Sequence, residues 1–127
     1  MKLVQEHFGK TVIVTGGSGF IGSAVVRYLI EKTDWRVINF DKLTYAACPE
    51  SLASVENNLR YHFVRGDVAD ETQVGAVFER FEPDAVMHLA AESHVDRSID
   101  GPLDFVKTNV LGTSVLLEIA RGYWQNL

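Results

Sequence analysis

Residues 10–22 read KTVIVTGGSGFIG: a short β-branched run, a cluster of glycines and the first turn of a helical pattern. The run predicts a strand buried on both faces. Gly16, Gly19 and Gly22 satisfy G-x-x-G-x-x-G, and Gly17, Gly19 and Gly22 satisfy G-x-G-x-x-G. Glycines at such a bend let a pyrophosphate approach the backbone where a helix presents free N–H groups and the positive end of its dipole. The stretch therefore predicts a dinucleotide-binding loop, a mere tight turn being the alternative.

The rest of the chain alternates between strand and helix patterns. Strands are predicted at 10–15, 35–40, 61–64 and 84–91, and helices after Gly19, after the capping-box pair Asp70 and Gln73, and at 102–121. The apolar faces of the first two helices are expected at Ile21, Val25, Tyr28 and Leu29, and at Val74, Val77, Phe78 and Phe81. This order predicts an α/β class, a partial Rossmann fold whose parallel sheet has about four strands in the order 3-2-1-4 with flanking helices.

Composition sets limits on the function. The 127 residues carry 12 Lys and Arg against 17 Asp and Glu, a net charge of −5, which argues against a nucleic-acid surface. No apolar run approaches the roughly 20 residues of a membrane helix, and the start of the chain does not read as a secretory signal. One cysteine excludes an internal disulfide, and the histidines show no metal-ligand spacing. We expect one domain with no metal site and no membrane or nucleic-acid partner, and cytoplasmic localisation fits.

Two acidic residues follow strands where a dinucleotide would lie. Asp41 comes 19 residues after Gly22, at the end of the second strand, where its carboxylate can accept hydrogen bonds from the adenosine ribose hydroxyls. It would repel a 2′-phosphate, so NAD is favoured over NADP, although Lys42 weakens that preference. Asp67 follows the third strand and is placed to meet the adenine edge. The alternative for Asp67 is a plain turn residue.

The end of the fourth strand is the second candidate part of the site, because ligands of open α/β sheets bind at the carboxyl ends of strands. Small residues at Ala90 and Ala91 would let a flat cofactor lie against the backbone, and polar residues follow at once from Glu92 to Arg97. Loop capping is the alternative for these polar residues. His88 lies on the strand itself, and we interpret it as a hydrogen-bonded core histidine.

The last predicted helix is apolar on two sides. Leu103, Val106, Val110 and Leu117 fall on one side of the helical wheel, and Phe105, Leu116 and Ile119 fall on another. A surface helix needs only one apolar stripe. The second cover is either more of the same polypeptide or a partner subunit.

Four segments together resemble one enzyme family, the dTDP-glucose 4,6-dehydratases of the extended short-chain dehydrogenase/reductase superfamily: TGGSGFIGS at 15–23, DKLTYA at 41–46, GDV at 66–68 and HLAAESHVDRSI at 88–99. The resemblance implies that hydride passes from C4 of dTDP-glucose to NAD+. The 4-keto group then acidifies the C5 proton, water leaves from C6, and the hydride returns to C6. The product is dTDP-4-keto-6-deoxyglucose.

The resemblance also implies roles for individual residues. The glycines of the loop, with Phe20 and Ile21, would line the pyrophosphate, and Ser93 would touch both the cofactor and the sugar. Asp41, Lys42, Leu43 and Thr44 would surround the adenosine ribose, and Asp67 and Val68 the adenine. Leu89, Ala90, Ala91 and Glu92 would line the nicotinamide side, and Thr108 would help hold the cofactor. The family is typically dimeric through the helix corresponding to 102–121.

Two motifs of the family, Thr-Asp-Glu and the catalytic Tyr-x-x-x-Lys, are not found at the expected place. A Tyr-x-x-x-Lys at Tyr28–Lys32 lies on the helix after the glycine loop, roughly 15 Å along it, and is no catalytic pair. We therefore expect residues 1–127 to be the N-terminal NAD-binding part of such an enzyme, without catalytic residues, inactive alone and weak in NAD binding. The alternatives are a sibling 4-epimerase or UDP-sugar dehydratase, and a non-catalytic NAD-binding module.

Overall fold

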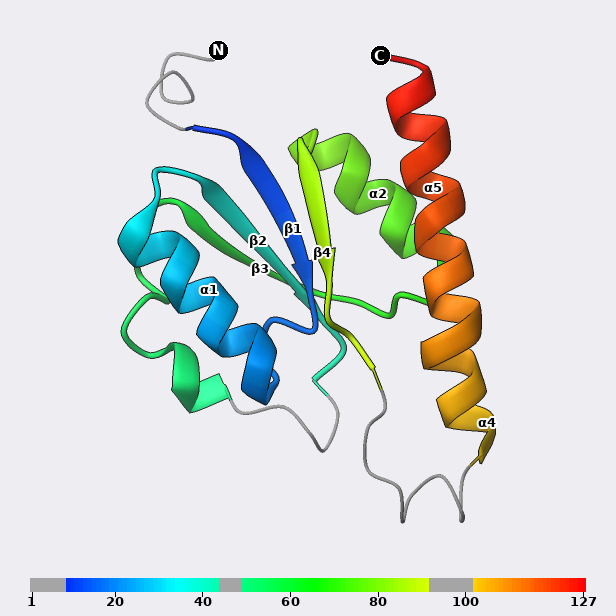
Figure 1. Cartoon of the computed structure of the whole chain (residues 1–127), viewed down its shortest axis with the longest axis horizontal. Helices are drawn as coiled ribbons and strands as arrows, with labels where there is room; N and C mark the ends of the chain where they lie inside the picture. Colours follow the sequence, from blue (N-terminus) through cyan, green and yellow to red (C-terminus); the bar gives the residue numbers. More distant parts are fainter. Residues whose placement is uncertain (1–8, 44–48, 92–101) are drawn as a thin grey trace.

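The computed structural model describes residues 9–43, 49–91 and 102–127, and its centre is one parallel sheet. Four strands form this sheet: β1 (Thr11–Thr15), β2 (Arg36–Asp41), β3 (Tyr61–Arg65) and β4 (Ala85–His88). Their order is β3-β2-β1-β4, with Val12 beside Val37 on one side and Ala85 on the other. The predicted α/β class and strand order are confirmed (Figure 1).

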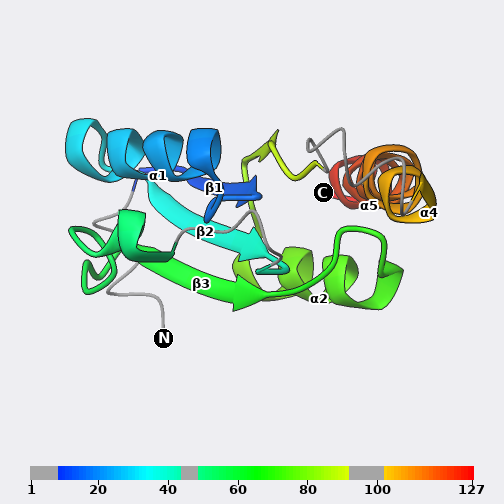
Figure 2. The ribbon, with the colours of Figure 1, turned by 90° about the horizontal axis from the view of Figure 1, so that it is seen from below.

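Helices cover both faces of the sheet. Helix α1 (Phe20–Lys32) and the short 3-10 helix η2 (Pro49–Leu52) lie on one face, and α2 (Glu71–Phe81) lies on the other (Figure 2). The chain ends in a long helical segment made of α4 (Pro102–Phe105), the π-helix η3 (Val106–Gly112) and α5 (Thr113–Gln125). The expected helix 102–121 is therefore present, but it contains a π-helical stretch and continues to Gln125.

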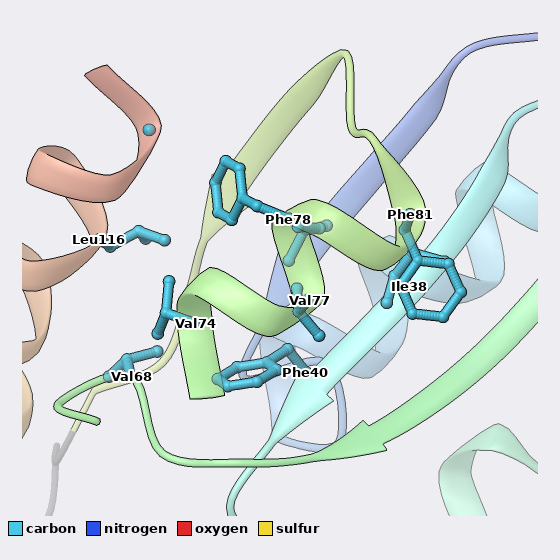
Figure 3. Packing of buried hydrophobic residues seen from close by; sticks show 10 residues of the cluster. Ile38, Phe40, Val68, Val74, Val77, Phe78, Phe81 and Leu116 are labelled. Carbon is cyan, nitrogen blue, oxygen red and sulfur yellow. The ribbon is translucent and has the colours of Figure 1, made fainter. Parts of the chain in front are cut away.

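Two apolar clusters hold these layers together, one on each face of the sheet. Successive residues of a strand point to opposite faces, so Ile13 and Ile38 belong to the α2 side, whereas Val12, Val14 and Val37 belong to the α1 side. The α2-side cluster also joins α2 to α5; its labelled members in Figure 3 are Ile38, Phe40, Val68, Val74, Val77, Phe78, Phe81 and Leu116. The predicted apolar face of α2 is thus confirmed.

The predicted apolar face of α1 is half right: Val25 and Leu29 pack, partly buried, against the cluster on that side of the sheet, whereas Ile21 and Tyr28 are exposed. The helix buries Gly22, Ser23, Val26 and Ile30, whereas Tyr28 is 62% exposed. The glycine bend fixes the angle at which the helix leaves β1. Small residues at 22 and 23 then allow the helix to lie close to the sheet, so the buried stripe follows the close approach and not the largest side chains.

The fourth strand and the last helix also differ from expectation. Strand β4 ends at His88: the Leu89 N–H still donates to the Thr15 carbonyl oxygen at 3.0 Å, a bond it shares with the Thr15 Oγ1, whereas the Ala90 N–H donates to the Thr15 Oγ1. On the last helix only the side that carries Leu116 is covered, by α2. The other side exposes Leu103, Val106, Val110, Leu111 and Leu117.

Candidate functional site

The candidate site lies at the carboxyl ends of β1, β2 and β4, where the glycine loop leads into α1. Strand β1 has β2 on one side and β4 on the other, so the direction in which strands are added reverses here. Ligands of open α/β sheets bind at such a switch point. Figure 1 shows the start of α1 and the ends of these strands at the same lower edge of the sheet.

The glycines of the loop have different roles. Gly16 has a φ of +72°, and a Cβ there would come within 2.7 Å of the backbone of Ala90. A Cβ on Gly22 would come within 1.9 Å of the Gly16 carbonyl oxygen. These two glycines are required by backbone packing. A Cβ on Gly19 would meet only that oxygen, at 3.4 Å, so Gly19 leaves open space in front of the helix.

The first turn of α1 provides an anion-binding end. Its first N–H groups have no intrahelical acceptor, as at every helix N-terminus. The N-cap residue Gly19 supplies no side-chain cap, and no acidic residue lies in the first turn. The side chains of Phe20 and Ile21 are exposed, so both residues are accessible next to Gly19. The amides and the helix dipole can therefore meet a phosphate from solvent.

Asp41 is fixed to the loop as well as placed for a ribose. The residue is only 9% exposed at the end of β2. One carboxylate oxygen accepts from the Ser18 N–H at 2.8 Å, and the other accepts from the Leu43 N–H at 2.7 Å. Each carboxylate oxygen has a further lone pair that can accept from a hydroxyl. The sequence placed Asp41 near the loop but did not predict this link.

The Ser18 hydroxyl accepts a hydrogen bond from a buried polar side chain of β2, that of Asn39. Asn39 is fully buried, and its Nδ2 donates to the Ser18 hydroxyl at 2.9 Å and to the Tyr61 hydroxyl at 3.1 Å. Burial is the main cause that raises the pKa of Tyr61, which keeps its hydroxyl protonated. Sequence reasoning missed this support for the loop. The signal was a single polar residue, Asn39, within the otherwise apolar stretch VINF at 37–40.

Lys42 and Asp67 face each other across the ends of β2 and β3. The Lys42 Nζ lies 3.3 Å from a carboxylate oxygen of Asp67, and both side chains are partly exposed. The other carboxylate oxygen of Asp67 accepts from the Ala69 N–H at 2.9 Å, and the Asp67 N–H donates to Gln73 at 2.8 Å. The structure thus gives Asp67 the turn contacts of the alternative interpretation, with its carboxylate partly exposed beside Lys42.

Val68 packs into the protein interior. Its side chain is 4% exposed within the α2-side cluster, and a Cβ on Gly112 would meet the Val68 Cγ2 at 2.5 Å. A ligand contact at this position would use the backbone of Val68. Thr108 lies half-buried on the π-helix η3.

The end of β4 borders the glycine loop. The Thr15 Oγ1 accepts from the Leu89 N–H at 3.0 Å and from the Ala90 N–H at 3.2 Å. Ala90 is the residue whose backbone a Cβ on Gly16 would meet, so loop and strand end are in contact, with Ala91 exposed beyond them. The expected contacts of Thr44, Glu92 and Ser93 lie outside the described residues.

The interpretation of His88 as a hydrogen-bonded structural histidine is confirmed. Its Nδ1 lies 2.6 Å from the Thr15 Oγ1, and its Nε2 lies 3.0 Å from the Thr113 Oγ1. Burial lowers the pKa of His88, which favours the neutral ring. Tyr28 and Lys32 are both exposed on α1, although the sequence pattern predicts Tyr28 on its apolar face.

Two negative findings hold for the described ranges. No helix among residues 9–43, 49–91 and 102–127 is long and apolar enough to cross a membrane. The same residues contain no group of three or more His, Cys, Asp or Glu side chains that could hold a metal ion.

Known proteins share this sequence and this fold. A dTDP-glucose 4,6-dehydratase of Haemophilus influenzae is 60% identical over 116 residues, which are 91% of this chain and 34% of the relative. One from Escherichia coli is 59% identical over 113 residues, or 89% of this chain and 31% of the relative. The crystal structure of the Streptomyces venezuelae dTDP-glucose 4,6-dehydratase with NAD bound has a TM-score of 0.80 at 44% identity, covering 87% of this chain and 35% of that chain.

Related nucleotide-sugar enzymes share the fold as well. A Thermus thermophilus UDP-glucose 4-epimerase complex with NAD has a TM-score of 0.78 at 35% identity, covering 89% of this chain and 34% of that one. The chain thus spans about a third of the length of the relatives it matches. The family model described as GDP-mannose 4,6 dehydratase matches residues 13–127. The chain therefore belongs to the GDP-mannose 4,6 dehydratase family.

Proposed function

We propose that this chain is the NAD-binding part of a dTDP-glucose 4,6-dehydratase. The observation that carries the proposal is the glycine loop at the switch point of the sheet, with Asp41 hydrogen-bonded to that loop. The identity of about 60% to dTDP-glucose 4,6-dehydratases supports this reaction over that of the 4-epimerases, which share the fold at lower identity. A nucleotide-sugar panel assayed with a full-length protein that contains this sequence would separate the two.

The described residues fit NAD. The open space in front of Gly19 gives a pyrophosphate access to the amides at the start of α1, at the positive end of the helix dipole. The Asp41 carboxylate would accept from the ribose hydroxyls, and the Lys42–Asp67 pair would border the adenine. The backbone of Leu89 and Ala90 would face the nicotinamide. When bound, NAD supplies a reversible hydride acceptor.

We assign NAD rather than NADP on electrostatic grounds. The buried Asp41 carboxylate at the ribose position would repel a 2′-phosphate, and a buried charge is weakly screened. Lys42, the nearby cation, is directed to Asp67 at 3.3 Å. Its charge is therefore partly neutralised before any ligand arrives.

The remaining assignments rest on the relatives. The substrate is dTDP-glucose, which Ser93 would touch, and the product is dTDP-4-keto-6-deoxyglucose. The substrate domain and the catalytic Tyr-x-x-x-Lys would belong to sequence beyond residues 1–127. We assign the protein to the cytoplasm. The exposed apolar side of the last helix would pair with a second copy in a homodimer.

Isothermal titration of the 127-residue protein tests the cofactor assignment. We expect NAD to bind more tightly than NADP, and Asp41→Asn to weaken NAD binding about tenfold or more, because a charge-assisted acceptor is lost. Glu31→Gln, an exposed charge change elsewhere on α1, serves as the control and should leave the affinity unchanged. Equal affinity of wild type for both dinucleotides, or turnover of dTDP-glucose by residues 1–127, would contradict the proposal.

A further inference from the structure

We propose that His88 is a positioning residue. In its neutral form, with the proton on Nε2, it links Thr113 at the start of α5 to Thr15 at the end of β1, beside the NAD site. The inference rests on the proposed function for the identity of the ligand. Its geometry comes from hydrogen bonds between β1, β4, η3 and α5. The two can be tested separately.

The proton positions follow from the partners of Thr113. The Thr113 hydroxyl donates to the Asn109 carbonyl oxygen at 2.9 Å. A hydroxyl has one proton, so toward His88 it can only accept, and the His88 Nε2 must carry the hydrogen of the 3.0 Å contact. In a neutral ring the Nδ1 then has a lone pair and accepts from the Thr15 hydroxyl at 2.6 Å.

The same chain of hydrogen bonds ends in the cofactor site. Because the Thr15 hydroxyl donates its hydrogen bond to His88, its Oγ1 can accept. It accepts from the Ala90 N–H at 3.2 Å and shares the Leu89 N–H, at 3.0 Å, with the Thr15 carbonyl oxygen. Thr15 immediately precedes Gly16, and a Cβ on Gly16 would meet the backbone of Ala90. The orientation of the His88 ring therefore affects the position of both the glycine loop at Gly16 and the Leu89–Ala90 backbone at the end of β4.

The other end of the chain fixes a helix. Thr113 is the first residue of α5, where the π-helical turn of η3 returns to α-helix. At the far end of α5 the indole N–H of Trp124 donates to the Pro83 carbonyl oxygen at 3.2 Å. His88 thus hydrogen-bonds to the start of α5, at the end of that helix nearest the site, and connects this helix to β1 through a single side chain.

Only the neutral ring fits this arrangement. In a cationic ring the Nδ1 would carry a second N–H toward a Thr15 oxygen that already accepts from two amides. Among the described residues, the groups hydrogen-bonded to the ring are the Thr15 and Thr113 hydroxyls, neither of which carries a charge. Neither hydroxyl stabilises a cation, in agreement with burial as the cause that lowers the pKa of His88.

The test combines ring NMR with NAD binding in the 127-residue protein. Two-bond ¹H–¹⁵N spectra should show His88 neutral with the proton on Nε2 at pH 7. Thr113→Val should shift the Leu89 and Ala90 amide resonances and weaken NAD binding by about fivefold, as expected for one misplaced group of hydrogen bonds. Thr113→Ser should restore both. Thr33→Val, which removes two hydrogen bonds at the opposite end of the sheet, is the control for destabilisation alone.

A second pair of variants separates the two sides of the ring. His88→Asn can replace only the Nδ1 contact to Thr15, whereas His88→Gln can replace only the Nε2 contact to Thr113. We expect Asn to retain the wild-type Ala90 amide shift better than Gln does. We expect Gln to protect the α5 amides from hydrogen exchange better than Asn does.

Three results would overturn the inference. One is a proton on Nδ1 or a cationic ring at pH 7. Another is a Thr113→Val protein that is less stable but has unchanged Leu89 and Ala90 shifts. The third is unchanged NAD affinity in that variant. A wild-type protein that binds no NAD would instead refute the proposed function, and the amide shifts would still decide whether His88 positions the strand end.

Discussion

At the scale of single residues, the glycine motif combines two different physical demands. Gly16 and Gly22 are required because a Cβ would collide with backbone, at 2.7 Å from Ala90 and 1.9 Å from the Gly16 carbonyl oxygen, respectively. Gly19 has ordinary space for a Cβ and an ordinary backbone conformation, with φ near −79°. Its value lies in what its missing side chain leaves open to a ligand.

This difference predicts opposite consequences for alanine substitutions. Gly22→Ala should destabilise the protein by about 2 kcal/mol or more, because backbone must move. Gly19→Ala should change the free energy of unfolding by less than about 1 kcal/mol, yet weaken NAD binding about tenfold by filling the approach to the amides. Urea denaturation and NAD titration measure the two effects.

Gly75→Ala is the matched control for both substitutions. A Cβ at this position in α2 meets nothing within 4 Å, so alanine should stabilise the helix by about 0.5–1 kcal/mol and leave NAD binding unchanged. If Gly19→Ala unfolds the protein as Gly22→Ala does, the distinction between packing and clearance fails.

At the scale of elements, α2 shows how a local signal is only partly realised. Asp70 is the N-cap, as the sequence predicts, and accepts from the Gln73 N–H at 3.1 Å. The Gln73 side chain, however, accepts from the Asp67 N–H at 2.8 Å and does not complete a reciprocal capping box with Asp70. The helix start is therefore joined to the turn that carries Asp67.

Removal of this cap should cost a predictable amount. We expect Asp70→Ala to lower the free energy of unfolding by about 1 kcal/mol, because the Gln73 amide loses its acceptor. Urea denaturation should give the same m-value as for the wild type. Glu79→Ala, an exposed position on the same helix, should have almost no effect. An Asp70→Ala loss no larger than that of Glu79→Ala would show that solvent replaces the cap.

The last helical segment provides a second prediction at this scale. If its exposed apolar side pairs with a second copy, Leu117→Asp should turn a dimer into a monomer in sedimentation velocity, since Leu117 is 65% exposed on that side. Leu59→Asp is the control, because Leu59 is 86% exposed in a turn and should leave the oligomeric state unchanged. A wild-type protein that is monomeric at all concentrations would contradict the homodimer proposal.

At the scale of the whole molecule, two histidines couple stability to pH in the same direction. Burial lowers the pKa of His62, and the nearby Arg36 and Arg80 lower it further; burial alone lowers the pKa of His88. The unfolded chain therefore binds more protons below its histidine pKa of about 6.5 than the folded protein does. Their contribution to stability is complete above that pKa, and is lost as the pH falls toward the lower folded values.

We accordingly expect the free energy of unfolding to fall as the pH decreases from about 7 to about 5. Urea titrations at half-unit pH intervals should show this slope, and it should be smaller in His62→Gln and in His88→Gln. A slope that is the same in both variants as in the wild type would exclude these histidines as its source.

Much of the fold could be predicted from local sequence. The β-branched run of β1, the glycine bend and the apolar period of α2 each specify their element by short-range sterics and by the number of residues per turn. The alternation of strands and helices then restricts the sheet to parallel strands with right-handed crossovers. The position of Asp41 at a strand end likewise needed no three-dimensional information.

Contacts between distant residues decided the rest. Periodicity assigned Tyr28 to the wrong face of α1, because the angle of that helix is set by how closely Gly22 approaches Gly16. No pattern in the sequence could show that Asp41 binds the Ser18 amide, or that His88 joins Thr15 to Thr113. Those hydrogen bonds link residues 23 to 73 positions apart, and their geometry exists only once the sheet has brought the strand ends together.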